Sequence, residues 1–218
     1  MKIVINSNKN FTIALDKLMD SFRNLKEFKD FEFIICIGGF YELPTYNLEH
    51  NENITYIKCN HNSIDFTGLI TLLELLPNEI GHFFYLHDTC VVGENFLKYL
   101  QKTDLNGITT MCIVRQSSMN IGIYSFDILL KFNDFLLNNK NTDDTKVQYF
   151  KNKGVDDEDH IFKNDDNNKI YRNQGKPSYV KFKRYYGGAV RKIEHYKKID
   201  LYKIKANWLR KTEYQMNI

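Results

Sequence analysis

The most distinctive chemistry-bearing feature of the sequence is a polar triplet that follows a hydrophobic run. His82-Phe-Phe-Tyr-Leu86 has the composition of a buried strand, and it leads directly into His87-Asp88-Thr89 before apolar residues resume. A carboxylate at the end of a strand is well placed to hold a divalent metal, and oxygen ligands suit Mg²⁺ or Mn²⁺. Asp88 is therefore a candidate metal ligand, although a turn at this point, or a cap for the helix after Gly93, explains the triplet equally well.

A second candidate is the acidic segment Asp156-Asp157-Glu158-Asp159, which His160 follows. Carboxylates this close together repel one another, so partly buried members would have raised pKa values, as a general base requires. The apolar neighbours Val155, Ile161 and Phe162 favour a segment anchored to the fold. A solvated acidic loop is the alternative interpretation.

The last fifty residues form a basic tail that the overall net charge of +3 conceals. Residues 169–218 carry fourteen Lys and Arg and three acids, which leaves sixteen bases and twenty-four acids in residues 1–168. Tyrosines alternate with these bases, a pattern that could bind single-stranded nucleic acid, a diphosphate or an anionic membrane, or only form a solvated surface. The tail also offers His195 as a candidate metal ligand, although a single histidine is more often structural.

Short apolar runs alternate with amphipathic segments through the first two thirds of the chain. Strands are expected at 2–6, 31–37, 54–59, 82–86 and 108–114, and helices at 12–25, 66–76, 95–100 and 126–137. Near-continuous apolar strands separated by helices predict an α/β fold with a mostly parallel central sheet and helices on both faces. The polar residues 138–153 are predicted to be a loop, and the tail is predicted to form a basic C-terminal subdomain.

Ligands of such sheets bind beyond the carboxyl ends of the strands, so the residues that follow each strand are candidates for a binding site. These residues are Asn6 and Ser7, Gly38 and Gly39, Asn60 to Asp65, His87 to Thr89, and Arg115 to Ser118. The polar groups of 60–65 precede a predicted helix, where a phosphate or ribose hydroxyls would find donors.

Several classes of protein are excluded or disfavoured. No apolar run approaches the length of a membrane-spanning helix, and the N-terminal run is too short for a signal peptide. The four cysteines lie far apart in apolar segments without a CxxC pair, which predicts reduced core residues and a cytoplasmic protein. Neither a GxGxxG nor a P-loop motif occurs. The chain is compatible with being one domain of a larger polypeptide.

Taken together, the layout of residues 2–160 resembles that of glycosyltransferases of the GT-A fold. In that family a hydrophobic strand ends in a DxD-type motif that binds the metal and the donor diphosphate, and Phe83 to Thr89 occupies this place with one carboxylate instead of two. Met119 to Ser125 is similar to the segment that shapes the donor-sugar and acceptor pocket. Asp157 to Asp159 is similar to the later acidic motif that meets the acceptor hydroxyl.

The resemblance implies a nucleotide-diphospho-sugar transferase-like fold over 1–218, with a nucleotide-binding half at 1–115 and, at 116–218, an acceptor half and the basic arm. It implies transfer of a sugar from a nucleotide-sugar donor, expected to be a UDP-sugar, to a hydroxyl of a carbohydrate or glycoconjugate acceptor. Mn²⁺ or Mg²⁺ would be the cofactor, and no nucleic-acid partner is expected.

The same resemblance assigns roles to individual residues. Catalytic roles fall to Asp157, Glu158 and Asp159, and metal binding falls to Asp88 and His195. Donor binding falls to Asn6, Ser7, Gly38, Asn60, Asp65, His87, Asp88, Arg115 and Arg191. Within the tail, the bases expected to meet the diphosphate are Arg172, Lys176, Arg184 and Arg191.

Other functions stay open at this point. A nucleotidyltransferase that makes sugar nucleotides usually has a glycine-rich basic loop soon after the first strand, which Asn6 to Asn10 lacks. A nucleic-acid-binding module would use the basic arm and would bind with strong salt dependence. An inactive transferase fold that serves in an assembly is a further alternative.

Overall fold

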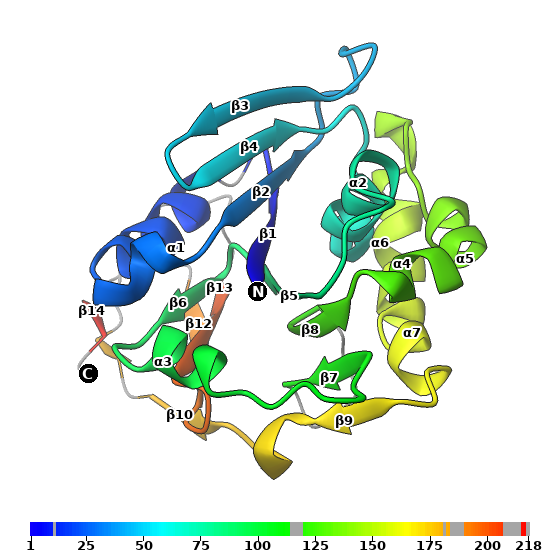
Figure 1. Cartoon of the computed structure of the whole chain (residues 1–218). Coiled ribbons are helices and arrows are strands. Elements are labelled where there is room, and N and C mark those ends of the chain that lie inside the picture. Colours follow the sequence, from blue (N-terminus) through cyan, green and yellow to red (C-terminus); the bar gives the residue numbers. More distant parts are fainter. Residues whose placement is uncertain (11, 114–119, 181, 184–189, 207–214, 217–218) are drawn as a thin grey trace. The chain divides into compact units, whose positions relative to one another are not determined.

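The chain folds into two units, each assembled from three segments that are separate in the sequence. Figure 1 labels the helices and strands. Unit 1 comprises Met1–Lys9, Phe31–His87 and Leu105–Asn173, and unit 2 comprises Asn10–Asp30, Asp88–Asp104 and Gln174–Ile218. The structure is a computed structural model, and it describes all residues except 11, 114–119, 181, 184–189, 207–214 and 217–218.

Unit 1 is built on an eight-stranded sheet with the order β3-β4-β2-β1-β5-β8-β7-β9. The strands are β1 (Lys2–Asn8), β2 (Phe33–Gly38), β3 (Asn47–Asn51), β4 (Ile54–Lys58), β5 (His82–His87), β7 (Thr110–Cys112), β8 (Gly122–Ser125) and β9 (Asn168–Ile170). The neighbours β4, β2, β1 and β5 are parallel, so their carboxyl ends lie at one edge. β9 is parallel to β7, whereas β3 is antiparallel to β4 and β8 is antiparallel to β5 and β7. The predicted α/β class with a large, mostly parallel sheet is confirmed.

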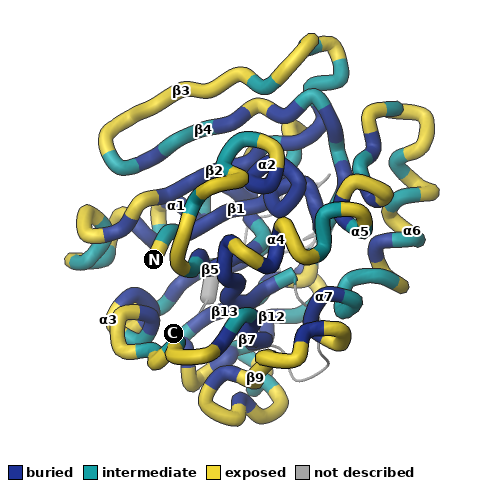
Figure 2. The backbone as a smooth tube through the Cα atoms, turned by 45° about the vertical axis from the view of Figure 1, so that its right-hand side comes forward, coloured by how far each residue is buried: buried dark blue, intermediate teal, exposed yellow. Residues whose placement is uncertain are grey.

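Burial follows the sheet order, as Figure 2 shows by its dark central strands and its exposed edge strand β3. Ile3, Val4 and Ile5 are all fully buried. Because successive side chains of a strand point to opposite faces, β1 is covered on both faces, as parallel strands of this class are.

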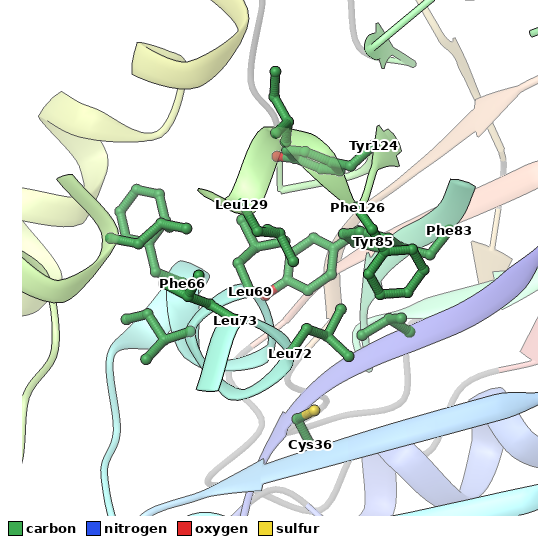
Figure 3. Packing of buried hydrophobic residues seen from close by; sticks show 14 of the residues in the cluster. Cys36, Phe66, Leu69, Leu72, Leu73, Phe83, Tyr85, Tyr124, Phe126 and Leu129 are labelled. Carbon is green, nitrogen blue, oxygen red and sulfur yellow. The ribbon is translucent and has the colours of Figure 1, made fainter. Parts of the chain in front are cut away.

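One face of the unit 1 sheet carries an apolar core around α2 (Thr67–Leu75), which packs on β1 and β2 and contacts α4 (Asp127–Lys131) and α5 (Asn133–Asn138). Figure 3 shows leucines of α2 beside the aromatic side chains of β5 and β8. The Phe83 and Tyr124 rings stack with centroids 5.5 Å apart. The Tyr85 hydroxyl donates to the backbone carbonyl of Asp65 at 2.7 Å, so this core is tied to the turn that precedes α2.

Unit 2 contains α1 (Thr12–Arg23), α3 (Phe96–Gln101) and two small sheets. One sheet has the order β10-β12-β13-β6, from β10 (Ser178–Tyr179), β12 (Val190–Tyr196), β13 (Leu201–Ala206) and β6 (Cys90–Val92), and the other pairs β11 (Phe182–Lys183) with β14 (Gln215–Met216). Helix α1 packs against β6, and the Val92 N–H of β6 donates to Ser21 Oγ of α1 at 3.1 Å. The tail is thus grouped with earlier segments, and the predicted division at residue 115 stays a prediction.

Two local expectations were wrong. Residues 138–153, expected as a loop, contain the 3₁₀ turn η3 (Asp144–Lys146) and most of helix α6 (Val147–Asp157), which α7 (His160–Lys163) follows. The sequence of α6 has little apolar periodicity, but the Asp143 side chain accepts from the Thr145 N–H at 2.9 Å, and Lys153 pairs with Asp157 one turn later. The apolar run 126–137 is divided into α4 and α5 at Phe132, whose backbone is not helical.

All four cysteines are buried and none forms a disulfide, as predicted. In the part of the chain that the structure describes, no helix combines the length and the apolar character needed to cross a membrane.

The contact between α2 and β5 gives the first testable expectation. A Cβ on Gly68 would lie 2.7 Å from Cε2 of the fully buried Tyr85. Gly68→Ala should therefore destabilise the protein by about 1 to 2 kcal/mol, because overpacking costs more than the helix propensity of alanine returns. Chemical denaturation measures this. Gly175→Ala, where the added Cβ meets open space, is the matched control and should be neutral; equal stability of both variants would contradict the packing.

Candidate functional site at the strand ends of unit 1

The site is organised by Asn6, near the carboxyl end of β1. Its Nδ2 donates to the carbonyl of Ile64 at 2.7 Å, and its Oδ1 accepts from the Gly68 N–H at 3.1 Å. The side chain is almost fully buried. Asn6 therefore fixes η2 (Ile64–Phe66) and the first turn of α2 to the end of the central strand.

Gly38, at the end of β2, lets the loop after β4 approach closely. A Cβ at this position would lie 3.1 Å from the His61 carbonyl oxygen and 3.2 Å from Cγ2 of Thr67. The next residue, Gly39, has φ +100° and donates its N–H to the same carbonyl at 3.0 Å. The two glycines thus have a packing role that is visible in the structure, beside the donor-binding role predicted for Gly38.

His61 anchors the loop after β4 from inside. Its ring is fully buried, with Nδ1 2.9 Å from Ser63 Oγ and Nε2 3.2 Å from the Tyr46 hydroxyl. Ser63 Oγ also accepts from the N–H of Asn141, and Asn62 donates its N–H to the Asn141 carbonyl at 2.9 Å. Burial, and then the charge of Lys140, lowers the pKa of His61 to about 4, so this residue is a neutral structural histidine.

Three backbone N–H groups of this loop and of the first turn of α2 already donate hydrogen bonds to side-chain oxygens of the protein. The Gly68 N–H donates to Asn6, the Ser63 N–H to Thr67 Oγ1 at 2.9 Å, and the Ile64 N–H to Asn62 Oδ1 at 3.3 Å. The expectation that the start of the helix offers donors to a phosphate does not hold for these three groups.

Asp65 and His87 form an ion-pair contact at this edge, with Asp65 Oδ1 3.2 Å from His87 Nε2. Both side chains keep a small exposed fraction, 17% and 16%. The turn that presents Asp65 is strained, because Ile64 has φ +55°, a region that β-branched residues rarely adopt. Helix α6 lies beside the pair, since a Cβ on Gly154 would be 3.9 Å from Asp65 Oδ2.

Glu158 approaches the same place from the end of α6. Its Oε2 accepts from Asn120 Nδ2 at 3.2 Å, just before β8, and β8 pairs with β5 so that Gly122 lies opposite Tyr85. Burial raises the pKa of Tyr124, and electrostatic interactions with Cys112 and with the carboxylates of Asp65 and Glu158 raise it further. Two carboxylates from distant parts of the chain therefore act on one buried phenol.

The other two acids of the cluster have different surroundings. Asp157 lies 3.3 Å from Lys153, and Asp159 lies 2.5 Å from Lys163, each one helical turn away. Glu158 is thus the member of the predicted catalytic set that hydrogen-bonds to the strand-end region.

The remaining predicted residues divide between the units. In unit 1, Ser7 is buried and Asn60 donates from Nδ2 to the Pro44 carbonyl at 3.4 Å. In unit 2, Asp88 is buried and Arg191 is exposed on β12. Arg115 and Arg184 lie outside the described residues.

His195, predicted as a metal ligand, lies on β12 in a network of its own. Its Nε2 is 3.1 Å from Asp200 Oδ1, and its ring stacks on Tyr202 with centroids 4.1 Å apart. The other oxygen of Asp200 accepts from the Asn95 N–H at 3.0 Å. Metal binding through Nε2 of His195 would require this pair to open. Among the residues that the structure describes, no group of three or more His, Cys, Asp or Glu side chains is arranged to hold a metal ion.

Three residues that shape the site were not singled out from the sequence. Asn120 and Tyr124 lie inside the segment 119–125, which was noted only as a whole. Their polar groups, next to an apolar run, could have marked them as candidate site residues. Asn141 lies in the segment that was expected to be a loop. It holds the loop after β4 through hydrogen bonds with Asn62 and Ser63, which no local sequence pattern predicts.

No family model matches the sequence, and no curated protein matches it. Among solved structures, the galactosyltransferase LgtC with donor and acceptor sugar analogues has 16% identity and a TM-score of 0.44, covering 63% of this chain and 64% of that one. The match to an active-site mutant of LgtC covers 58% of this chain and 58% of that one. This chain therefore spans less than two thirds of the length of either LgtC structure.

Two further glycosyltransferases are similar at the same level. GlyE from Streptococcus pneumoniae TIGR4 has 11% identity and a TM-score of 0.48, covering 79% of this chain and 45% of that one. A glycosyltransferase involved in glycosylation of the major capsid of PBCV-1 has 12% identity and a TM-score of 0.42, covering 78% and 82%. All of these TM-scores lie under 0.5, so the chemistry of the site rests on this chain's own residues.

The buried neutral state of His61 predicts a pH dependence of stability. The pKa is about 4 in the folded protein and near 6.5 for an ordinary histidine, so between these values the unfolded chain binds more protons. The free energy of unfolding should fall as pH drops from 6.5 to 4, by up to about 3 kcal/mol from this residue. Urea denaturation of wild type and His61→Gln across this range measures it. A parallel decline in both proteins would contradict the assignment.

Proposed function

We propose that the chain is a glycosyltransferase that moves a sugar from a nucleotide-sugar donor, a UDP-sugar, to the hydroxyl of a carbohydrate or glycoconjugate acceptor. The observation that carries the proposal is the pairing of Asp65 with His87 at the carboxyl ends of the parallel strands, together with Glu158, which hydrogen-bonds to Asn120 just before β8. Ligands of open α/β sheets bind at this edge. The resemblance of the sequence to GT-A glycosyltransferases assigns the donor to the same place.

In this proposal the acceptor oxygen attacks the anomeric carbon of the donor sugar while the bond from that carbon to the diphosphate oxygen breaks. Glu158 takes the proton of the acceptor hydroxyl, since a carboxylate within hydrogen-bond reach can act as general base. Asn120, which donates to Glu158 Oε2, orients the carboxylate. Tyr124 has a raised pKa, so it stays a neutral phenol near both acids.

A Mn²⁺ or Mg²⁺ ion would be held by Asp88 together with the phosphate oxygens of the donor. Mg²⁺ in nucleotide-dependent enzymes is usually bound by one or two carboxylates plus substrate phosphates, so the single carboxylate of the His87-Asp88-Thr89 motif fits an ion brought in with the donor. When bound, such an ion would neutralise charge on the departing diphosphate. Arg191 and the neighbouring bases of the tail are proposed to add to this neutralisation.

A nucleic-acid-binding module is the second candidate, and the sheet of unit 2 weakens its support. Lys192 lies 2.7 Å and Lys205 lies 3.4 Å from Glu194, a buried carboxylate on the same sheet. Part of the positive charge counted in the tail is therefore compensated locally. No basic glycine-rich loop follows β1 in the sequence, which equally disfavours a nucleotidyltransferase.

Replacing Glu158 tests the catalytic assignment. Glu158→Gln keeps the size of the side chain and removes the base, so the transfer rate kcat should fall by about 100-fold or more while the KM for the donor changes little. Steady-state kinetics with the donor that binds measures both constants. Asp156→Asn, an exposed acid of the same segment, is the matched control and should retain activity. Full activity in Glu158→Gln would refute the assignment.

A thermal-shift panel of nucleoside diphosphates and nucleotide sugars, with and without Mn²⁺, tests donor and metal together. Binding to the folded state raises Tm by mass action, by about 5 to 10 °C for a ligand at a hundred times its Kd. We expect a shift with one class of nucleotide sugar, an additional shift with Mn²⁺, and little effect of Mn²⁺ alone. Asp88→Asn should lose only the Mn²⁺ increment. Stabilisation by generic RNA or DNA, with none by any nucleotide, would replace this proposal by the second candidate.

A further inference from the structure

One face of the four-stranded sheet of unit 2 gathers three lysines around a single carboxylate. Lys192 and Glu194 are alternate residues of β12, so their side chains point to the same face. On β13, Lys205 lies opposite Lys192 and Lys203 lies opposite Glu194, and on the other side Tyr179 of β10 lies opposite Glu194. Opposite residues of an antiparallel pair share a face. These five side chains therefore form one surface, here called the lysine face.

Glu194 holds two of the lysines in place. Its side chain is only 7% exposed, and its Oε1 lies 2.7 Å from Lys192 Nζ and 3.4 Å from Lys205 Nζ. Burial raises the pKa of Glu194, but the hydrogen bond from Lys192 and the charge of Lys205 outweigh burial and lower the pKa, so this group is a carboxylate at neutral pH. It offsets the repulsion between two like charges that lie directly opposite each other. One carboxylate does not balance three lysines, so the face keeps a net positive charge.

Tyr179 adds an exposed aromatic ring to the lysine face. The residue is 66% exposed, although Lys192 Nζ lies over its ring, 4.3 Å from the centroid. The ammonium group covers one side of the ring, and the exposure leaves room for a ligand to pack on the tyrosine. The tyrosines of β12 and β13 do not extend this platform, because Tyr196 is 2% and Tyr202 is 5% exposed.

The composition around the lysine face favours an anionic ligand. Residues 174–206 contain ten Lys and Arg and two acids, Glu194 and Asp200, and each of these acids already contacts a basic side chain of the same unit. Lysine ammonium groups bind carboxylate, sulfate and phosphate groups through charge-assisted hydrogen bonds.

The single exposed ring distinguishes between two kinds of anionic polymer. Single-stranded nucleic acids are bound by several aromatic side chains on which successive bases stack. Among the described residues of this sheet, Tyr179 alone offers an exposed tyrosine ring. One ring suffices for one sugar, whose apolar C–H face packs on an aromatic side chain while its polar groups stay hydrated. Lysines beside such a ring match the acidic groups of a charged glycan.

We propose that the lysine face is a binding surface for an acidic glycan, in which a sugar ring packs on Tyr179 and carboxylate or sulfate groups pair with the lysines. The choice of a glycan rests on the proposed function, because a sugar transferase has to recognise a carbohydrate acceptor. The proposal adds a property of that acceptor, its negative charge, which the strand-end site of unit 1 does not specify.

Fluorescence anisotropy with a labelled heparin octasaccharide tests the surface without relying on turnover. Wild type should bind the probe. Tyr179→Ala should weaken binding about fivefold, whereas Tyr179→Phe should retain it because the ring remains. Lys192→Gln should weaken binding about threefold, and Glu194→Gln should strengthen it by about the same factor, because the face gains positive charge. A purely structural role of Glu194 would give the opposite sign.

Matched controls are Tyr149→Ala and Lys151→Gln, two exposed positions of α6 in unit 1, which should bind the probe as wild type does. Thermal unfolding verifies that each variant is folded. Unlabelled chondroitin sulfate should displace the probe, whereas neutral dextran and a single-stranded oligonucleotide should displace it poorly. Displacement by the oligonucleotide or by anionic lipid vesicles as efficient as by the glycan would overturn the proposal, since the face would then bind any polyanion. No binding by wild type, or equal affinity of wild type and Tyr179→Ala, would overturn it as well.

The donor thermal shift separates this inference from the proposed function. Tyr179→Ala should lose affinity for the heparin probe and keep the full shift with the nucleotide sugar. If wild type binds the glycan through Tyr179 but no nucleotide sugar shifts its Tm, the proposed function fails and the glycan surface stands. If the nucleotide sugar shifts Tm and the probe does not bind, the glycan surface fails and the proposed function stands.

Discussion

The site depends on one buried amide, the side chain of Asn6. It binds the Ile64 carbonyl and the Gly68 N–H at the same time, and so ties the central strand β1 to the turn after β4 and to the first turn of α2. Asn6 adds to the two contacts that Thr67 makes with the Ile64 carbonyl, and so helps to stabilise a backbone in which Ile64 has φ +55°. Gly38 makes the approach of the loop sterically feasible.

Once this turn is fixed, the side chains at the carboxyl ends of the parallel strands determine which chemistry is possible there. Asp65 meets His87 at the end of β5, and Glu158 arrives from α6 and is oriented by Asn120. The two acids have different partners and, in the proposed mechanism, different purposes: Asp65 is paired with a histidine, whereas Glu158 is held by a neutral amide. In the proposed mechanism the donor binds at this edge, next to a carboxylate that accepts the proton of the acceptor hydroxyl.

The parallel strands and the polar residues after them could be predicted because the apolar composition of a strand is a local property, and Asn6, Gly38, Asp65 and His87 all follow such runs. The order of the strands in the sheet was not predicted. Helix α6 could not be predicted, since it follows the 3₁₀ turn that Asp143 caps and contacts the Asp65 turn at Gly154, and it lacks a buried apolar face. The different surroundings of Asp157, Glu158 and Asp159 could not be predicted either. They depend on the hydrogen bond from Asn120 to Glu158 and on the lysines that pair with the other two acids one helical turn away. Long-range partners of this kind leave no pattern in the sequence.

Hydrogen–deuterium exchange of the full chain, with and without the nucleotide sugar that binds, tests most directly that the strand ends of unit 1 are the donor site. We expect slower exchange in the peptides that contain residues 60–66, 86–88 and 154–160, with little change in the exposed edge strand β3. Protection confined to β12 and β13 would contradict this assignment, because the ligand would then bind the basic sheet of unit 2 and not the edge that Asp65, His87 and Glu158 form.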